Sequence, residues 1–422
     1  MYIDTIDVQN FRTFHKSRIQ FVHPDLDFGR LGMPKPRLRN VNLLLGNNGF
    51  GKTTLLKAVA LALLGPAAGR AGIYPYRLVR REAGGVRNDR LRATIRAEIV
   101  THGQDGASRS RLFSHLAIDR QGDLESIENC LEDPAGWEAI FSAESDAFFF
   151  VGYGATRRVE AKERTDTGAR SSMRFPRAQR VQSLFEEAYS LIPLSAWLPG
   201  FQSGNPGRYK QIVTLINKLM GQRHYQFNGE LEQGEYLFER NGLKVPFPAL
   251  SDGYRAFLGW VGDLLYHVCT TCPSGARLDE NHGVVLVDEI DLHLHPKWQM
   301  TVLGTLARAL PNIQFIVTSH SPLIVGSLEW MNIIAMGSGP KQSTVAKRFR
   351  TPVHGLDADQ VLLTDFFGLN STRSPAHARS LKSLTLSARE GDAAAALSLL
   401  QAMSGGSATE RAHGDGEPGE AE

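Results

Sequence analysis

The chain has 422 residues, of which 42% are hydrophobic and 22% charged, with a net charge of +3. These values are ordinary for a globular protein of two or three domains, and the charge alone does not argue for nucleic acid. The N-terminus lacks the apolar stretch of a signal peptide, and no apolar run approaches the roughly 20 residues of a membrane span. Three cysteines cannot form a disulfide framework. A cytoplasmic protein without a membrane partner is therefore expected.

The first half of the chain is expected to hold several strands and one long helix. Residues 2–21 alternate polar and apolar side chains, which predicts a hairpin, and residues 91–118 predict further strands. Val41–Gly46 is a continuous apolar run, typical of a buried parallel strand. A helix is expected at Lys52–Gly65, and another buried strand within Ser145–Ala155.

Residues 157–180 form a basic segment, with eight Lys or Arg against three acidic residues and a local net charge of +5. One interpretation is a solvated surface loop. The other is a loop that faces phosphate groups, with DNA as the partner. On that interpretation the DNA-facing residues are Arg170, Arg174, Arg177 and Arg180.

The second half is expected to begin with helices and a hairpin over residues 181–245. Residues 283–296 and 313–322 contain two buried strands with a helix of about 14 residues between them, which predicts parallel pairing. A small helical region is expected over residues 339–403. The Gly- and Glu-rich residues 404–422 are expected to be disordered.

The stretch GNNGFGKTT matches the phosphate-binding pattern G-x-x-x-x-G-K-[ST], between a strand and a helix. Its glycines would let backbone N–H groups approach the phosphates of ATP. Lys52 would reach the β- and γ-phosphates, and the Thr53 hydroxyl would ligate Mg²⁺. The expected ATP-binding residues are Gly46, Asn47, Asn48, Gly49, Gly51, Lys52, Thr53 and Thr54.

Two neighbouring strands are expected to supply the rest of a hydrolytic site. Asp288 follows four apolar residues and offers Mg²⁺ a second hard oxygen ligand beside Thr53. Consecutive carboxylates at a strand end point in different directions, so Glu289 is assigned as the general base. His320 ends the next strand, where it would sense the γ-phosphate and orient the attacking water. The expected cofactors are ATP and Mg²⁺.

These motifs resemble those of an ABC-type (AAA family) ATPase of the RecF/SMC/OLD-like branch, without a coiled coil or a Toprim nuclease domain. The stretches IDTIDVQNFRTF, GNNGFGKTT, LSDGY, VVLVDEIDLHLHP and TSHSP stand in family order and cover most of residues 1–335. The resemblance implies an α/β fold, a P-loop NTPase head of mixed and parallel sheet flanked by helices. The implied domains are a first lobe with Walker A (1–156), an inserted basic loop and helical lid (157–245), a second lobe with signature, Walker B and H-loop (246–338), a helical region (339–403) and an acidic tail (404–422).

The resemblance also explains a second phosphate site at the start of an apolar helix. In this family two subunits pack head to tail, and each signature caps the ATP that the other subunit holds. The Ser251 hydroxyl, the Gly253 N–H and the helix dipole would therefore act in trans. Two features depart from the family pattern. His295 stands where many members have an Asp, and no Q-loop glutamine is evident, although Gly152–Arg157 lies where that coupling loop is expected.

The resemblance implies ATP hydrolysis but leaves its purpose open. One reading is the sensor ATPase of a prokaryotic anti-phage defence complex, working as a homodimer or higher oligomer with a separate nuclease or toxin-like effector. The alternative is a RecF-like, ATP-gated DNA clamp for repair or recombination. The large insertion between Walker A and the signature argues against a transporter subunit. A built-in nuclease is disfavoured because Asp357 and Asp359 read better as the start of a helix than as metal ligands.

Two further patterns favour structural roles over metal binding. Cys269 and Cys272 form a CxxC, but no second pair is present to complete a zinc site. Asp291, His293 and His295 share one side of an extended segment, and a metal site is the weaker interpretation of that arrangement.

Overall fold

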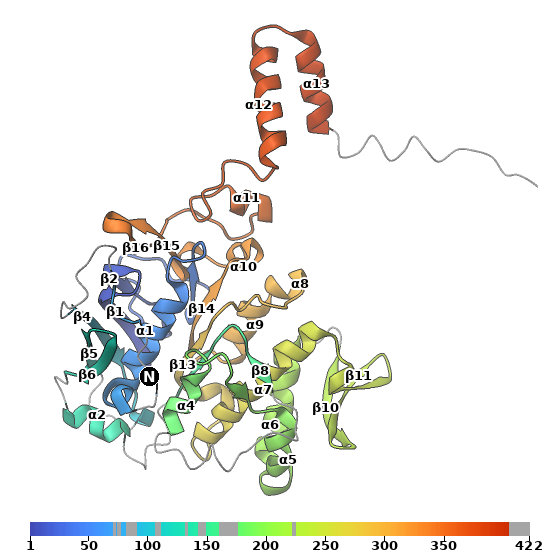
Figure 1. The fold of residues 1–422 in the computed structure, drawn as a ribbon. Coiled ribbons are helices and arrows are strands. Elements are labelled where there is room, and N and C mark those ends of the chain that lie inside the picture. Colours follow the sequence, from blue (N-terminus) through green and yellow to red (C-terminus); the bar gives the residue numbers. More distant parts are fainter. Residues whose placement is uncertain are drawn as a thin grey trace, which may run out of the picture. The chain divides into compact units, whose positions relative to one another are not determined.

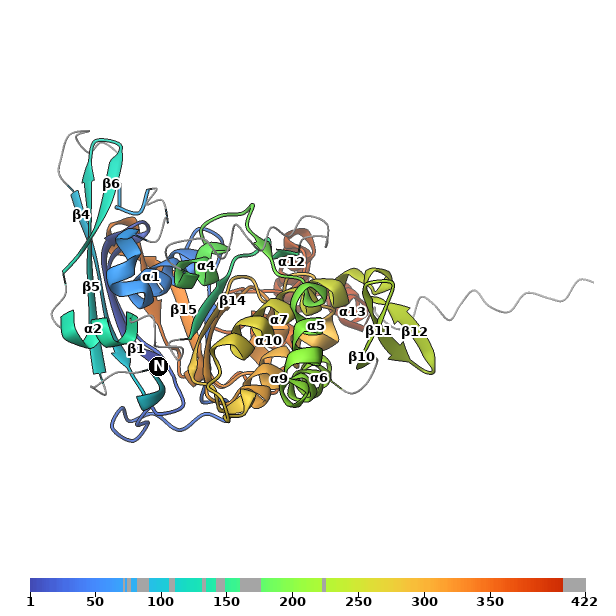
Figure 2. The same ribbon diagram turned by 90° about the horizontal axis from the view of Figure 1, so that it is seen from below.

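The structure, a computed structural model, describes residues 1–70, 73, 77–81, 91–105, 111–130, 134–141, 149–159, 176–221 and 225–404. The chain divides into two compact units, Met1–Val361 and Leu362–Glu422. Within the first unit, two sheets enclose a helix, and further helices cover the other face of the central sheet (Figures 1 and 2). In the described part of the chain, no helix is both long and apolar enough to cross a membrane.

The central sheet has six strands in the order β16-β15-β3-β14-β13-β7. All are parallel except β16, which pairs antiparallel at one edge. Every residue of β3, β13 and β14 is buried, because both faces of the sheet are covered, and this explains their continuous apolar sequences. The strands are β3 (Val41–Leu45), β7 (Phe150–Tyr153), β13 (Gly283–Val287), β14 (Ile313–Ser319), β15 (Ile333–Gly339) and β16 (Ser343–Lys347).

The second sheet is antiparallel, with five strands in the order β2-β1-β4-β5-β6. The expected N-terminal hairpin is present, and its two strands pair from Thr5 with Gln20 to Phe11 with Phe14. The strands predicted over residues 91–118 are also present. The bounds are β1 (Tyr2–Phe11), β2 (Phe14–Gln20), β4 (Leu91–Val100), β5 (Arg111–Gln121) and β6 (Leu124–Asn129).

Helix α1 (Lys52–Leu64) lies between the two sheets (Figure 2). It packs against β1, β4 and β5 on one side and against β13 and β14 on the other. Eleven of its 13 residues are buried, because both sides of the helix meet a sheet. A helix that is apolar all round is expected in such a position. The N-terminus of α1 is thereby fixed at the edge where the central strands end.

Two buried amide side chains of the central sheet join it to the second sheet. Asn42 on β3 accepts from the N–H of Val22 and donates to its carbonyl, both at 2.7 Å. Gln314 on β14 accepts from the N–H of Ile3 and donates to its carbonyl, both at 2.9 Å. Each amide reproduces the pairing of a peptide group, so these buried polar atoms are satisfied.

The other face of the central sheet carries the helical insertion. Helices α5 (Leu194–Gly204) and α6 (Pro206–Met220) lie beside α7 (Asp252–Thr271), and a small antiparallel sheet extends from them (Figure 2). This small sheet consists of β10 (Gln226–Glu232), β11 (Glu235–Arg240) and β12 (Leu243–Pro246). Shorter elements are α2 (Pro134–Phe141), α4 (Pro176–Gln182), β8 (Arg158–Val159), β9 (Ser190–Leu191) and α10 (Pro322–Gly326).

Two sequence expectations differ from the structure. The connection from β13 to β14 holds two short helices, α8 (Pro296–Gln299) and α9 (Val302–Ala309), in place of one long helix. The region from residue 339 begins with β16, which pairs with β15 in the central sheet, and helices follow only afterwards. These are α11 (Ala358–Leu362), α12 (Pro375–Arg389) and α13 (Ala393–Ser404). The tail expected to be disordered lies outside the described residues from 405 onward.

Candidate functional site

The P-loop joins β3 to α1 at the carboxyl edge of the central sheet. Gly51 has φ of 76° and precedes the first helical residue, and a Cβ there would lie 2.3 Å from the Thr13 hydroxyl oxygen. Gly46 runs so close to the neighbouring strand that a Cβ would meet the Met336 carbonyl oxygen at 2.5 Å. Both positions therefore require glycine. The first N–H groups of α1 have no partner within the helix and are available to phosphate oxygens.

Lys52 is buried and lies across its own loop. Its Nζ donates to the carbonyl oxygens of Gly46 at 2.8 Å and Asn47 at 3.2 Å. Burial lowers the pKa of Lys52, and the negative charges of Asp288, Glu289 and Asp291 oppose that shift. The lysine thus bridges two carbonyl groups of its own loop, and its ammonium group lies within the field of the site's carboxylates.

Asp288 is the centre of a hydrogen-bond network that joins three elements. The Thr53 hydroxyl on α1 donates to Asp288 Oδ2 at 2.7 Å, and the Thr318 hydroxyl on β14 donates to Oδ1 at 2.6 Å. The expected Mg²⁺ ligands Thr53 and Asp288 are therefore in direct contact. Thr318 has no part in the site expected from the sequence. The sequence could have pointed to Thr318, because this residue stands two positions before His320 in the TSH stretch.

Glu289 adopts the left-handed backbone conformation, with φ of 49°. Its N–H donates to the Thr318 hydroxyl oxygen at 2.7 Å, which fixes one side of this turn. A residue with a Cβ in this conformation costs about 1–2 kcal/mol and persists only where its surroundings hold it. The left-handed conformation of Glu289 thus places a turn directly after Asp288, at the end of β13.

Arg157 fixes the other side of the same turn. Its Nη1 donates to the Asp288 carbonyl oxygen at 3.1 Å and its Nη2 to the Glu289 carbonyl oxygen at 2.8 Å. Its guanidinium also lies over the Trp260 ring, 5.9 Å from the centroid. Burial lowers the pKa of Arg157 to about 10, so the side chain remains charged at neutral pH. The sequence placed Arg157 in the basic segment and at the end of the stretch where the coupling loop is expected, but it did not identify Arg157 as a site residue.

His320 follows the last residue of β14 and lies at the same edge of the sheet. Burial lowers its pKa below 6.5, and the positive charge of Lys52 adds to that shift. The imidazole is therefore neutral at pH 7 and can accept or donate a proton. The Oδ1 atom of Asp291 is buried at this edge and has no hydrogen-bond partner among the described residues.

The signature residues lie in a separate pocket at the start of α7, with a volume of about 450 Å³. Ser251 is exposed, and although it precedes the first residue of α7 its hydroxyl makes no capping hydrogen bond. Gly253 packs against the backbone of the Walker B segment, where a Cβ would lie 2.8 Å from the His293 carbonyl oxygen. The pocket is lined by Arg240, Ser251, Gly253, Tyr254, His295, Lys297 and Trp298, none of which belongs to the P-loop.

Other sequence-predicted positions do not join these two sites. Arg170 and Arg174 lie outside the described residues, as does the side chain of Arg177, whereas Arg180 lies on α4. In the described part of the chain, no group of three or more His, Cys, Asp or Glu could hold a metal ion. Asp357 directly precedes α11, as the helix-start interpretation expects.

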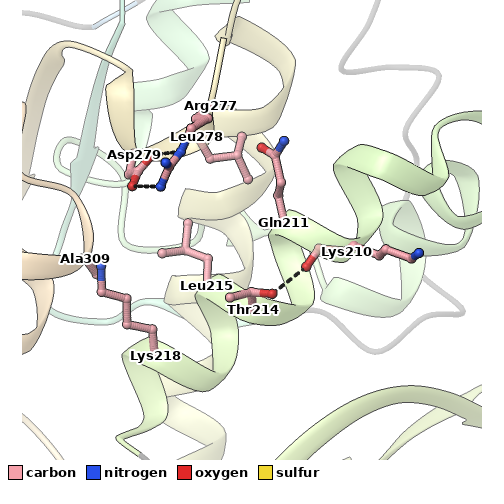
Figure 3. A pocket seen from close by; sticks show the side chains of 9 residues that line it. All are labelled: Lys210, Gln211, Thr214, Leu215, Lys218, Arg277, Leu278, Asp279 and Ala309. Atoms are coloured by element: carbon pink, nitrogen blue, oxygen red, sulfur yellow. Dashed lines mark hydrogen bonds and ion pairs between the residues drawn. The ribbon is translucent and has the colours of Figure 1, made fainter. Parts of the chain in front are cut away.

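Another pocket, of about 390 Å³, lies between α6 and the segment Arg277–Asp279 (Figure 3). Two of its three cations are already engaged, because Arg277 pairs with Asp279 and Lys218 donates to the Arg308 carbonyl oxygen at 3.0 Å. Lys210 points away from the other labelled side chains (Figure 3). Nothing in this pocket resembles the phosphate-binding arrangement at the P-loop.

The fold and the site together define a P-loop nucleotide-binding domain of the ABC type. A family model described as "AAA domain, putative AbiEii toxin, Type IV TA system" matches residues 41–326. Because this match covers more than half of the sequence, the chain belongs to that family. The expectation of an ABC-type, AAA-family ATPase fold is thereby confirmed.

The chain is similar to proteins whose names refer to Septu and to retrons. The chain is 23% identical over 377 residues to "Septu protein PtuA" of Bacillus mycoides (strain KBAB4), covering 88% of this chain and 45% of that protein. It is 42% identical over 86 residues to "Retron Vc95 probable ATPase" of Vibrio cholerae serotype O1 biovar El Tor, covering 20% of this chain and 17% of that one. The chain spans less than half the length of these relatives.

Among solved structures, the chain is similar to the "SMC head domain from Thermotoga maritima". The TM-score is 0.45 and the sequence identity 13%, covering 83% of this chain and all of that one.

Proposed function

We propose that this chain binds ATP with Mg²⁺ and hydrolyses it. The observation that carries the proposal is the network in which the hydroxyls of Thr53 and Thr318 both donate to Asp288, with Glu289 on the adjoining turn. The start of α1 and the ends of β13 and β14 deliver these groups to one place. A hydroxyl and a carboxylate in contact form the oxygen-rich ligand pair that Mg²⁺ prefers.

Each side chain then has a distinct task. Lys52 would exchange its two carbonyl acceptors for phosphate oxygens, and Thr53 and Asp288 would hold Mg²⁺. When bound, Mg²⁺ neutralises charge that develops on the phosphoryl oxygens. Glu289 would take the proton from the attacking water, and His320, neutral at pH 7, would orient that water beside the γ-phosphate.

We further propose that hydrolysis requires a head-to-tail homodimer. Support comes from the signature pocket, whose lining residues include none from the P-loop. In this pocket Ser251 stands at the start of a 20-residue helix, and its hydroxyl makes no capping hydrogen bond to that helix. The nucleotide for that pocket would come from a second copy. ATP would then hold two copies together, and loss of the γ-phosphate would release them.

The biological role that we propose is sensor or regulatory ATPase of a prokaryotic anti-phage defence complex with a separate effector. Support comes from the resemblance to compact OLD-like ATPases and from relatives that carry Septu and retron names. The nuclease or toxin-like effector and a cytoplasmic location are part of this proposal.

The test is a pull-down of the chain carrying Glu289→Gln, expressed from its own locus and analysed by mass spectrometry. Removing the general base should preserve the ATP-bound state and any assembly that depends on it. A stoichiometric nuclease or toxin-like protein is the expected result. Recovery of DNA with replication or repair proteins alone would favour a RecF-like clamp and contradict the defence role.

A further inference from the structure

We propose that Arg157 is a positioning residue that fixes the catalytic turn at Glu289 and couples it, through Trp260, to the chain's own signature helix. The inference rests on the proposed function. It adds a connection between the site that hydrolyses one ATP and the helix that caps the other.

The first step of the argument is the geometry at the turn. Consecutive carbonyl groups of an extended strand point to opposite sides, so one side chain cannot ordinarily reach both. Here the left-handed conformation of Glu289 brings the carbonyls of Asp288 and Glu289 to one guanidinium, at 3.1 and 2.8 Å. The planar fork of arginine donates to two acceptors at fixed spacing, whereas an ammonium group is a point charge. Arginine is therefore specifically suited to holding this turn.

The second step is the contact with α7. Arg157 lies over the Trp260 ring, and the Tyr153 ring lies 5.6 Å from the same indole. The Tyr153 hydroxyl donates to Asp263 Oδ2 at 2.8 Å. Trp260 and Asp263 are three residues apart, so they share one face of the helix. These three contacts join Tyr153, the last residue of β7, and Arg157, which follows it, to a single face of α7.

The third step links the same segment back to Walker B. The Asp288 N–H donates to the Tyr153 carbonyl oxygen at 2.8 Å, immediately before the turn that Arg157 holds. Ser251 lies nine residues before Trp260, about 13 Å along a rigid helix. A displacement of the signature end of α7 would therefore reach Arg157 and the Glu289 turn. Residues 153–157 belong to the stretch where the family resemblance leads us to expect the coupling loop.

The first experiment compares Arg157→Lys with Arg348→Lys in the full chain. Arg348 is a matched control because it is also a half-buried arginine that donates to backbone carbonyls, those of Met331 and Gln20, and its pKa is also lowered to about 10. We expect Arg157→Lys to lower kcat about tenfold or more, because a misplaced base is costly, and to leave the Kd for ATP nearly unchanged. Arg348→Lys should change neither quantity to a similar extent.

The second experiment tests the coupling in mixed dimers. The first copy carries Lys52→Ala and holds no nucleotide, so the signature helix of the second copy has no ATP to cap. Turnover by the second copy should fall several-fold if that copy is otherwise wild type. With Trp260→Leu in that copy, turnover should become insensitive to its partner. Phe257→Leu is the control. Phe257 lies on the same helix as Trp260, and its ring packs on Trp260 and on Trp298 of α8.

The outcomes separate this inference from the proposed function. A wild-type chain that neither hydrolyses ATP nor forms an ATP-dependent dimer would overturn the proposed function. If the wild type does both, an Arg157→Lys variant that loses no more kcat than Arg348→Lys overturns the positioning role. A Trp260→Leu copy that still responds to its empty partner overturns the coupling.

Discussion

The Thr53 hydroxyl donates a 2.7 Å hydrogen bond to Oδ2 of Asp288, which lies 235 residues further along the chain. This contact closes the gap between the start of α1 and the end of β13 and brings both expected Mg²⁺ ligands together. The same carboxylate accepts from Thr318 on its other oxygen. Both oxygens of Asp288 are therefore oriented before any ligand binds.

Replacing Asp288 with Asn should lower Mg²⁺-dependent ATP turnover roughly 100-fold, because a charged metal ligand becomes a neutral one. ATP binding in the presence of a chelator should change little. Steady-state hydrolysis across a Mg²⁺ titration, beside nucleotide binding by fluorescence, measures both. Asp279→Asn, whose carboxylate pairs with Arg277 outside the site, is the control. Equal losses in the two variants would count against Asp288 as a ligand.

Glu289→Gln should reduce kcat by about 10² to 10⁴, the usual contribution of a positioned general base. Because ATP would still bind, the variant should accumulate as a dimer in ATP and revert to monomer in ADP. Light scattering after size-exclusion chromatography distinguishes the two states. Glu128→Gln, on the second sheet and paired with Arg92, should behave as wild type. A Glu289→Gln variant with ordinary turnover would remove this residue from the mechanism.

Turnover per chain should rise with protein concentration, because the signature acts on the ATP of a second copy. Ser251→Ala should lower turnover roughly tenfold through loss of one hydrogen bond to a charged phosphate. Binding of ATP to dilute monomer should persist. Ser203→Ala, at an exposed position on α5, is the matched control. A turnover independent of concentration in a monomeric protein would contradict the dimer. Gly253→Ala is a poorer probe because the new Cβ would strike the His293 carbonyl.

The lowered pKa of His320 predicts a pH dependence of stability. Below pH 6.5 the unfolded chain protonates this histidine while the folded chain does not, so the unfolded state binds more protons. Stability should therefore fall as the pH drops below about 6.5. The decline in Tm from pH 7.5 to 5.5 should be steeper for wild type than for His320→Gln. Parallel curves would show that His320 is not held neutral in the folded protein.

The DNA-facing interpretation of the basic segment remains a prediction. Replacing Arg170, Arg174, Arg177 and Arg180 with Gln should reduce the slope of log affinity against log salt by up to about 3 to 4, if each arginine contacts a phosphate. Fluorescence anisotropy with duplex DNA at several salt concentrations measures the slope. Arg18→Gln with Arg277→Gln should leave it unchanged, since both arginines pair with carboxylates elsewhere. An unaltered slope in the quadruple variant would remove this segment from any DNA contact.

The parts of the fold that depend on short stretches of sequence could be predicted from the sequence. The apolar runs of β3, β13 and β14 identify buried strands, and Gly46, Lys52 and Asp288 stand in short motifs next to them. Parallel strands that end at one edge then bring the motif residues together, and the structure shows this for Thr53 and Asp288.

Long-range contacts to the backbone could not be predicted in the same way. Arg157 donates to carbonyl oxygens of residues more than 130 positions away. Because every residue has a backbone carbonyl, the sequence does not indicate which carbonyl groups a side chain will contact. The region after Ser338 was expected to be helical, but it begins with β16, a strand of five residues that pairs with β15 at the edge of the central sheet. The five-part domain division remains a prediction.

The paired amides of Asn42 and Gln314 have a consequence for how the two sheets can move. Apolar side chains tolerate sliding, because dispersion contacts have little directional preference, whereas an amide matched to one peptide group does not. A shift of one residue would break the four hydrogen bonds that these amides make with Val22 and Ile3 in a dry interior. Asn42 lies on the strand that leads into the P-loop, and Gln314 on the strand that leads to His320. The second sheet therefore fixes the positions of β3 and β14, and with them the strand ends that carry the site. Motion during turnover is expected on the opposite side of the central sheet, among the helices around α7.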